Sequence, residues 1–81
     1  MSRKEYLAGI GKAFLGDPGR GPEPNVVVLP DGAGVCVVQP VRGGGKVYVA
    51  QDETVLFVPS STDFDTGLAA FTRGERTSRK P

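Results

Sequence analysis

The stretch that decides the fold runs from residue 26 to residue 58 and reads VVVLPDGAGVCVVQPVRGGGKVYVAQDETVLFV. It holds four apolar runs rich in valine, at 26–29, 35–41, 46–50 and 54–58. Branched side chains of this kind suit the pleated surface of a sheet. The runs are separated by only three to five residues, and such short connections favour hairpins. The stretch therefore predicts an antiparallel sheet of three to four strands.

Both faces of this predicted sheet are apolar. Val35 and Val37 would point to one face, while Cys36 and Val38 would point to the other. A sheet that is apolar on both faces needs cover on both. Two helices would provide that cover, and so would one helix together with a second copy of the chain.

Two segments outside the stretch carry helical spacing. In each, three apolar side chains fall on one helical face: Leu7, Ile10 and Phe14 in the first, and Phe64, Leu68 and Phe71 in the second. We therefore expect an α+β fold with an N-terminal helix at about 3–15 and a short C-terminal helix at about 63–73. The expected organisation is a single domain over 1–74, followed by a flexible basic tail over 75–81.

Composition sets limits on the class of protein. The chain has 81 residues and a formal net charge of +1, so it fits one small domain without a strong overall field. A single cysteine, Cys36, cannot form an internal disulfide. No apolar run approaches the length of about 18 residues that a membrane span requires. These features favour a cytoplasmic protein that does not act in a membrane.

The most restrictive chemical feature is the absence of histidine. It excludes histidine-based catalytic triads, histidine general bases and metal sites that contain histidine. Cys36 lies among valines, where a thiol behaves as a small buried hydrophobe rather than a nucleophile. We therefore expect no enzyme activity, no catalytic residue and no cofactor.

Two further segments resemble ligand sites only in part. Arg42-Gly43-Gly44-Gly45-Lys46 offers glycines and flanking charges, but a phosphate loop of the Walker type would continue into a helix, and here a strand follows. A flexible hairpin loop is the favoured interpretation. Asp63 and Asp65 lie beside hydroxyl residues, yet helix capping explains them without a metal.

The preferred function is that of a non-enzymatic protein-interaction module, such as an inhibitor, an immunity factor or a small regulatory subunit. Its basis is a sheet with more apolar surface than so short a chain would be expected to cover. Tyr48, Leu56 and Val58 are the residues predicted to contact a partner. That partner is expected to be another protein or a second copy of this chain.

The alternative function is that of an accessory protein that binds nucleic acid through its basic ends. The candidate residues lie near the C-terminus, and they are Arg73, Arg76, Arg79 and Lys80. Such side chains could neutralise phosphates. A binder of single strands would usually add exposed aromatic side chains, and few are expected here, so this function ranks second.

Overall fold

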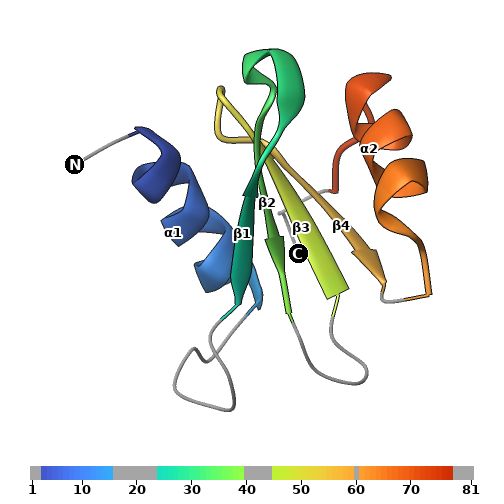
Figure 1. The fold of residues 1–81 in the computed structure, drawn as a ribbon, viewed down its shortest axis with the longest axis horizontal. Coiled ribbons are helices and arrows are strands. Elements are labelled where there is room, and N and C mark those ends of the chain that lie inside the picture. Colours follow the sequence, from blue (N-terminus) through green and yellow to red (C-terminus); the bar gives the residue numbers. More distant parts are fainter. Residues whose placement is uncertain (1–2, 16–23, 40–44, 60, 78–81) are drawn as a thin grey trace.

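The computed structural model describes residues 3–15, 24–39, 45–59 and 61–77. The elements follow one another as α1 (Arg3–Leu15), β1 (Asn25–Val28), the 3-10 turn η1 (Pro30–Gly32), β2 (Gly34–Val38), β3 (Gly45–Ala50), β4 (Val55–Pro59) and α2 (Phe64–Thr72). Figure 1 shows the sheet between the two helices. The predicted α+β fold is confirmed.

The four strands form one antiparallel sheet in the order β1-β2-β3-β4, so each strand pairs with its neighbours in sequence. Representative partners are Val27 with Cys36, Cys36 with Tyr48, and Tyr48 with Leu56. Strand bounds differ from the predicted ones by one residue at most ends. The larger difference is β2, which ends at Val38, while Pro40 and Val41 lie outside the described residues.

Helix α1 covers one face of the sheet. Its contacts are with β2 and β3, and the core on this face consists of Leu7, Val35, Val47, Val49 and Val55. Gly11 makes the close approach possible, because a Cβ atom at this position would lie 2.6 Å from Cγ2 of Val37. The glycine that weakens the isolated helix thus lets the helix pack tightly on the sheet.

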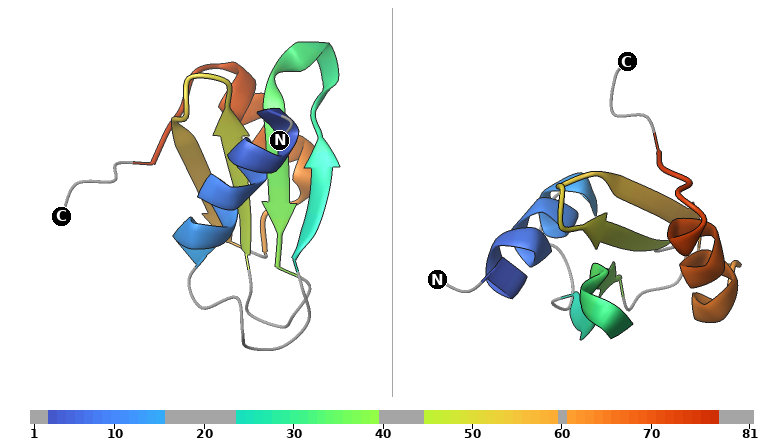
Figure 2. Two further views of the ribbon diagram at one scale, coloured as in Figure 1. Left: turned by 90° about the vertical axis from the view of Figure 1, so that its left-hand side faces the viewer. Right: turned by 90° about the horizontal axis from the view of Figure 1, so that it is seen from above.

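Helix α2 covers the opposite face, as the view from above in Figure 2 shows. The core here consists of Leu29, Cys36, Tyr48, Ala50, Leu56, Val58 and Phe71. Gly67 faces Tyr48, whose hydroxyl oxygen would lie 2.6 Å from an added Cβ atom. The predicted need for cover on both faces is therefore met within one chain, by two helices that each approach the sheet through a glycine.

The start of α2 is fixed by Asp63. Its side chain accepts a hydrogen bond of 2.8 Å from the backbone N–H of Thr66. Hydrogen bonding from the Thr66 side chain, and then from its backbone, lowers the pKa of the Asp63 carboxyl. The residue that caps the helix is therefore Asp63. No helix among the described residues is long and apolar enough to cross a membrane.

Candidate functional site

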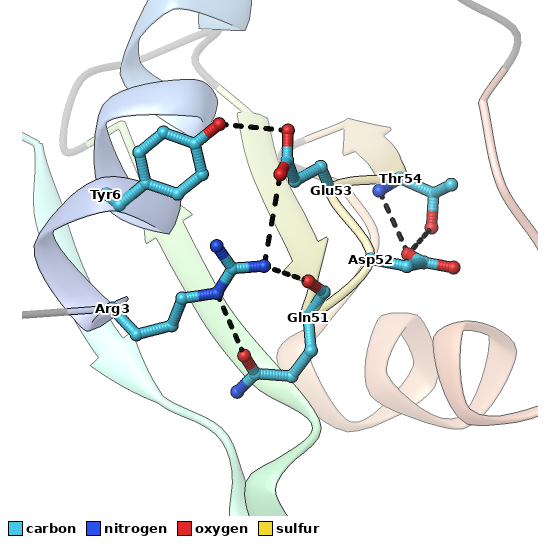
Figure 3. Close-up of polar contacts among 6 residues, drawn as sticks. All are labelled: Arg3, Tyr6, Gln51, Asp52, Glu53 and Thr54. Carbon is cyan, nitrogen blue, oxygen red and sulfur yellow. Dashed lines mark hydrogen bonds and ion pairs between the residues drawn. The ribbon is translucent and has the colours of Figure 1, made fainter.

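Four exposed side chains gather where the first turns of α1 meet the hairpin between β3 and β4 (Figure 3). We call Arg3, Tyr6, Gln51 and Glu53 the loop-end cluster. Its members come from two parts of the chain that are 47 or 48 residues apart.

The hairpin between β3 and β4 places Glu53 in an unusual backbone conformation. The N–H of Glu53 donates to the carbonyl of Ala50, and the N–H of Ala50 donates to the carbonyl of Thr54, both at 2.9 Å. Glu53 has a φ of 73°, in the left-handed region that glycine or asparagine usually occupies in hairpins of this kind. For another L-residue this conformation costs about 1–2 kcal/mol.

Asp52 holds the turn from the other side. Its carboxylate accepts hydrogen bonds from the hydroxyl of Thr54 at 2.6 Å and from the N–H of Thr54 at 3.1 Å. These bonds to Thr54 lower the pKa of the Asp52 carboxyl. The turn therefore aims Glu53 toward α1 while Asp52 points away (Figure 3).

The Glu53 carboxylate contacts one aromatic and one basic residue of α1, Tyr6 and Arg3. The Tyr6 hydroxyl donates to its Oε1 at 3.0 Å, and Nη2 of Arg3 lies 3.9 Å from its Oε2. The guanidinium of Arg3 also lies over the Tyr6 ring, 5.1 Å from its centre. The hydrogen bond to Glu53 is the main reason that the pKa of Tyr6 is raised.

Gln51 extends the cluster to a third segment. Arg3 donates to its side-chain oxygen at 3.4 Å and also to its backbone carbonyl. The Gln51 amide in turn donates to the carbonyl of Gly32 at 3.2 Å. The first turn of α1, η1 and the β3–β4 turn are thus connected by side chains that all remain exposed to solvent.

The contribution of this cluster to folding stability is small. Exposed ion pairs contribute only about 0–1 kcal/mol, which the left-handed conformation of Glu53 offsets. These contacts instead hold the side chains of Tyr6 and Arg3 in one orientation. Tyr6 is 43% exposed. Tyrosine and arginine are enriched among the residues that dominate binding energy at protein interfaces.

The three residues predicted to bind a partner lie elsewhere, beneath α2. Tyr48, Leu56 and Val58 are all buried. The Tyr48 hydroxyl donates to the carbonyl of Phe64 at 2.7 Å, and its ring packs against Phe71 with centres 5.6 Å apart. The chain's own helix therefore occupies the surface that the sequence assigned to a partner. Their role in partner binding stays a prediction, and it would require α2 to leave the sheet.

Two of the four residues proposed for nucleic-acid binding are already engaged. Arg73 forms an ion pair of 2.8 Å with Glu75. The guanidinium of Arg76 lies 4.1 Å from the centre of the Phe71 ring and donates to the hydroxyl of Thr54 at 2.8 Å. Arg79 and Lys80 lie outside the described residues. Arg76 therefore uses its Nε and Nη1 donors in contacts within the domain.

The same contacts bear on the predicted tail over 75–81. Glu75 donates its N–H to the carbonyl of Ala70 at 3.1 Å, and Thr77 donates its N–H to the carbonyl of Val55 at 2.8 Å. The first three residues of the segment, 75–77, therefore lie against α2 and β4. Residues 78–81 are outside the described part of the chain.

The remaining candidate residues have structural roles. Cys36 is fully buried, and burial raises the pKa of its thiol to about 11, which disfavours the nucleophilic thiolate. Lys46 donates to the carbonyl of Thr62 and so ties β3 to the segment before α2, whereas 42–44 lie outside the described residues. Within the described ranges no group of three or more acidic or cysteine side chains could hold a metal ion.

Comparisons with known proteins add no assignment. No family model matches the chain, and no curated protein or solved structure is significantly similar to it. The loop-end cluster was not found by sequence reasoning, because Gln-Asp-Glu at 51–53 reads only as a turn and nothing local connects it to Tyr6.

Proposed function

We propose that this chain is a non-enzymatic protein-interaction module, of the kind that serves as an inhibitor, an immunity factor or a small regulatory subunit, and that it meets its partner through the loop-end cluster. The observation that carries the proposal is the strained Glu53, whose carboxylate sets the positions of exposed Tyr6 and Arg3. A cytoplasmic site of action belongs to the same proposal.

The chemistry of the surface supports binding of a protein. Tyrosine provides a large contact area with few rotatable bonds, and arginine provides several donors in a fixed plane. Because these two side chains are already held by Glu53 and Gln51, less conformational entropy is lost when a partner binds. Stability alone does not account for a glutamate in a position where glycine would be unstrained.

The test begins with capture of partners on the immobilised full chain from an extract of the cells that make it. The captured protein is then purified, and its dissociation constant is measured for the wild type and for three variants. We expect Tyr6→Ala to weaken binding by about 30-fold, the effect of losing an interface hot spot. Arg73→Ala is the matched control, because Arg73 is an exposed, ion-paired arginine outside the cluster.

Glu53→Gly separates binding from folding. Glycine relieves the left-handed strain, which offsets the loss of exposed contacts, so unfolding free energy should change by less than about 1 kcal/mol. Binding should nevertheless weaken, since Tyr6 and Arg3 lose their fixed orientation. Failure to find any saturable partner contradicts the function. A partner whose affinity is insensitive to Tyr6→Ala and Glu53→Gly contradicts only the assigned surface.

A further inference from the structure

On the outer edge of β1, the backbone N–H and C=O groups that point away from the sheet are placed symmetrically on either side of Val27. The N–H of Leu29 donates to the carbonyl of Gly34 at 2.9 Å, and bonded pairs alternate along an antiparallel ladder. Val27 therefore points its backbone groups toward β2, whereas Val26 and Val28 point theirs outward. Within the described residues no hydrogen bond engages these outward groups.

The side chains of this edge are apolar and accessible. Val28 is 60% exposed and Val27 is 40% exposed. Val28 pairs with Val35 and thus lies on the α1 face, while Val27 pairs with Cys36 and lies on the α2 face. The segment from Pro24 to Pro30 carries no charge, so nothing on it repels an approaching uncharged strand or an identical one.

We propose that β1 is an interface between two copies of this chain, in which two β1 strands pair antiparallel about a two-fold axis at Val27 and join the sheets into one of eight strands. In this register the outward groups of Val26 bond with those of Val28 in the partner copy, and those of Val28 bond with Val26. All four outward N–H groups in the pair then find acceptors.

The flanking prolines favour this register over its neighbours. Pro24 and Pro30 are equally far from Val27, and neither has an N–H to donate. Moving the register by two residues would place a proline opposite a valine that needs a donor, so fewer hydrogen bonds would form. Because a two-fold interface uses the same edge of both copies, the pairing closes as a dimer and does not propagate.

The small size of the edge sets the strength of the dimer. Strand β1 has four residues, whereas a standard stable interface uses about 20–30 residues on each side. The dimer should therefore be weak and reversible, and it should form as concentration rises. This inference does not depend on the loop-end cluster or on the partner proposed for it, since the two surfaces share no residue.

The first test measures the wild type alone. Sedimentation equilibrium should give the monomer mass of 8.5 kDa in dilute solution and a rising average mass up to about 1 mM, the weak end of the affinity scale. Val27→Lys should abolish the rise, because two ammonium groups would face each other across the axis. A wild type that stays monomeric throughout, or a dimer that persists in Val27→Lys, overturns the proposal.

The second test reads the register with disulfides, in a Cys36→Ala background so that the introduced thiol is the only one. Val27→Cys places the two thiols opposite each other in a non-hydrogen-bonded pair, where Cα atoms lie about 4.5 Å apart, within disulfide range. Val28→Cys is the matched control, since it is more exposed but faces Val26 of the other copy. Air oxidation should link Val27→Cys at least about tenfold faster. Equal rates, or faster linkage of Val28→Cys, overturn the register.

Discussion

The two edge strands of the sheet, β1 and β4, differ in how far the rest of the chain hydrogen-bonds to their outward backbone groups. At β4 the outward carbonyl of Val55 accepts from the N–H of Thr77, and the outward N–H of Phe57 donates to the Thr77 hydroxyl, both at 2.8 Å. At β1 the outward groups of Val26 and Val28 have no such partner within the described residues. A single threonine therefore engages part of the β4 edge, whereas no described residue engages the outward groups of β1.

Thr77 closes its edge because it supplies both kinds of group that a strand would supply. Its N–H acts as the donor, and its hydroxyl oxygen takes the place of a strand carbonyl. Arg76 fixes the segment by lying on the Phe71 ring and by donating to the Phe71 carbonyl at 2.9 Å. Edge protection of this kind is how proteins limit unwanted strand pairing, and among the described residues β1 has no equivalent of it.

Removal of residues 75–81 should have the largest effect on the comparison. The 1–74 chain loses the hydrogen bonds of Glu75, Arg76 and Thr77, and at about 1 kcal/mol for each net bond, less the ordering cost of three residues, unfolding free energy should fall by about 1–3 kcal/mol. A flexible tail, as the sequence predicted for 75–81, would give no loss. Urea denaturation checks the value, with 1–77 as the control chain.

The same truncation should make the two edges alike. The exchange rate of the Phe57 amide should rise toward the rates of the Val26 and Val28 amides, which we expect to exchange fast in the dilute monomer. Self-association at high concentration should also increase, because β4 now presents open groups. A 1–74 chain as stable as the full chain, with a protected Phe57 amide, would show that the β4 edge is not closed by this segment.

A smaller effect is expected from Thr77→Val. The change keeps the shape of the side chain but removes the acceptor for the Phe57 N–H, so unfolding free energy should fall by about 1 kcal/mol. Hydrogen exchange of the Phe57 amide should accelerate, whereas that of the Val26 and Val28 amides should not change. Thr77→Ser retains the hydroxyl and should keep the Phe57 amide protected. Equal exchange in both variants would contradict the assigned bond.

The smallest expected effect is the loss of folding stability at low pH that Asp63 causes. The folded-state pKa of Asp63 is lowered by its bonds to Thr66, so its ionised form stabilises the folded chain. That contribution is complete above the unfolded pKa of about 3.9 and is lost as pH falls through the lower folded value. Stability of the wild type should therefore decline in acid more than that of Asp63→Asn. Identical declines in urea titrations at several pH values would contradict the cap.

Acid should also act on one side of the molecule more than the other. Asp63 begins the helix that follows β4, whereas β1 itself contains no ionisable side chain. Loosening of α2 in acid should raise amide exchange near its first turn, including the Thr66 amide, before it affects the β1–β2 ladder. Exchange that rises equally in both regions would mean that the two sides unfold together.

Local patterns in the sequence were enough for the elements and their order along the chain, whereas the order of the strands within the sheet came from the structure. Runs of valine separated by three to five residues can hardly form anything other than hairpins, and apolar side chains at spacings of three and four indicate helices. The requirement for cover on both faces of the sheet also followed from the runs themselves. The candidate site did not follow, because Tyr6 and Glu53 meet across 47 residues and neither belongs to a periodic pattern.

The sequence by itself therefore determined an antiparallel sheet of three to four strands with a helix before it and a helix after it, since side-chain periodicity acts within each segment. Only the tertiary structure decided that α2 takes the face containing Tyr48, that Arg76 and Thr77 lie against the β4 edge, and that no residue of the described ranges bonds to the outward groups of β1. These outcomes depend on single hydrogen bonds and ring contacts between distant residues. The local sequence around a serine or threonine near the end of a chain is the same whether its side chain is solvated or bonds to a sheet edge. The difference depends on which backbone groups the folded chain places next to it.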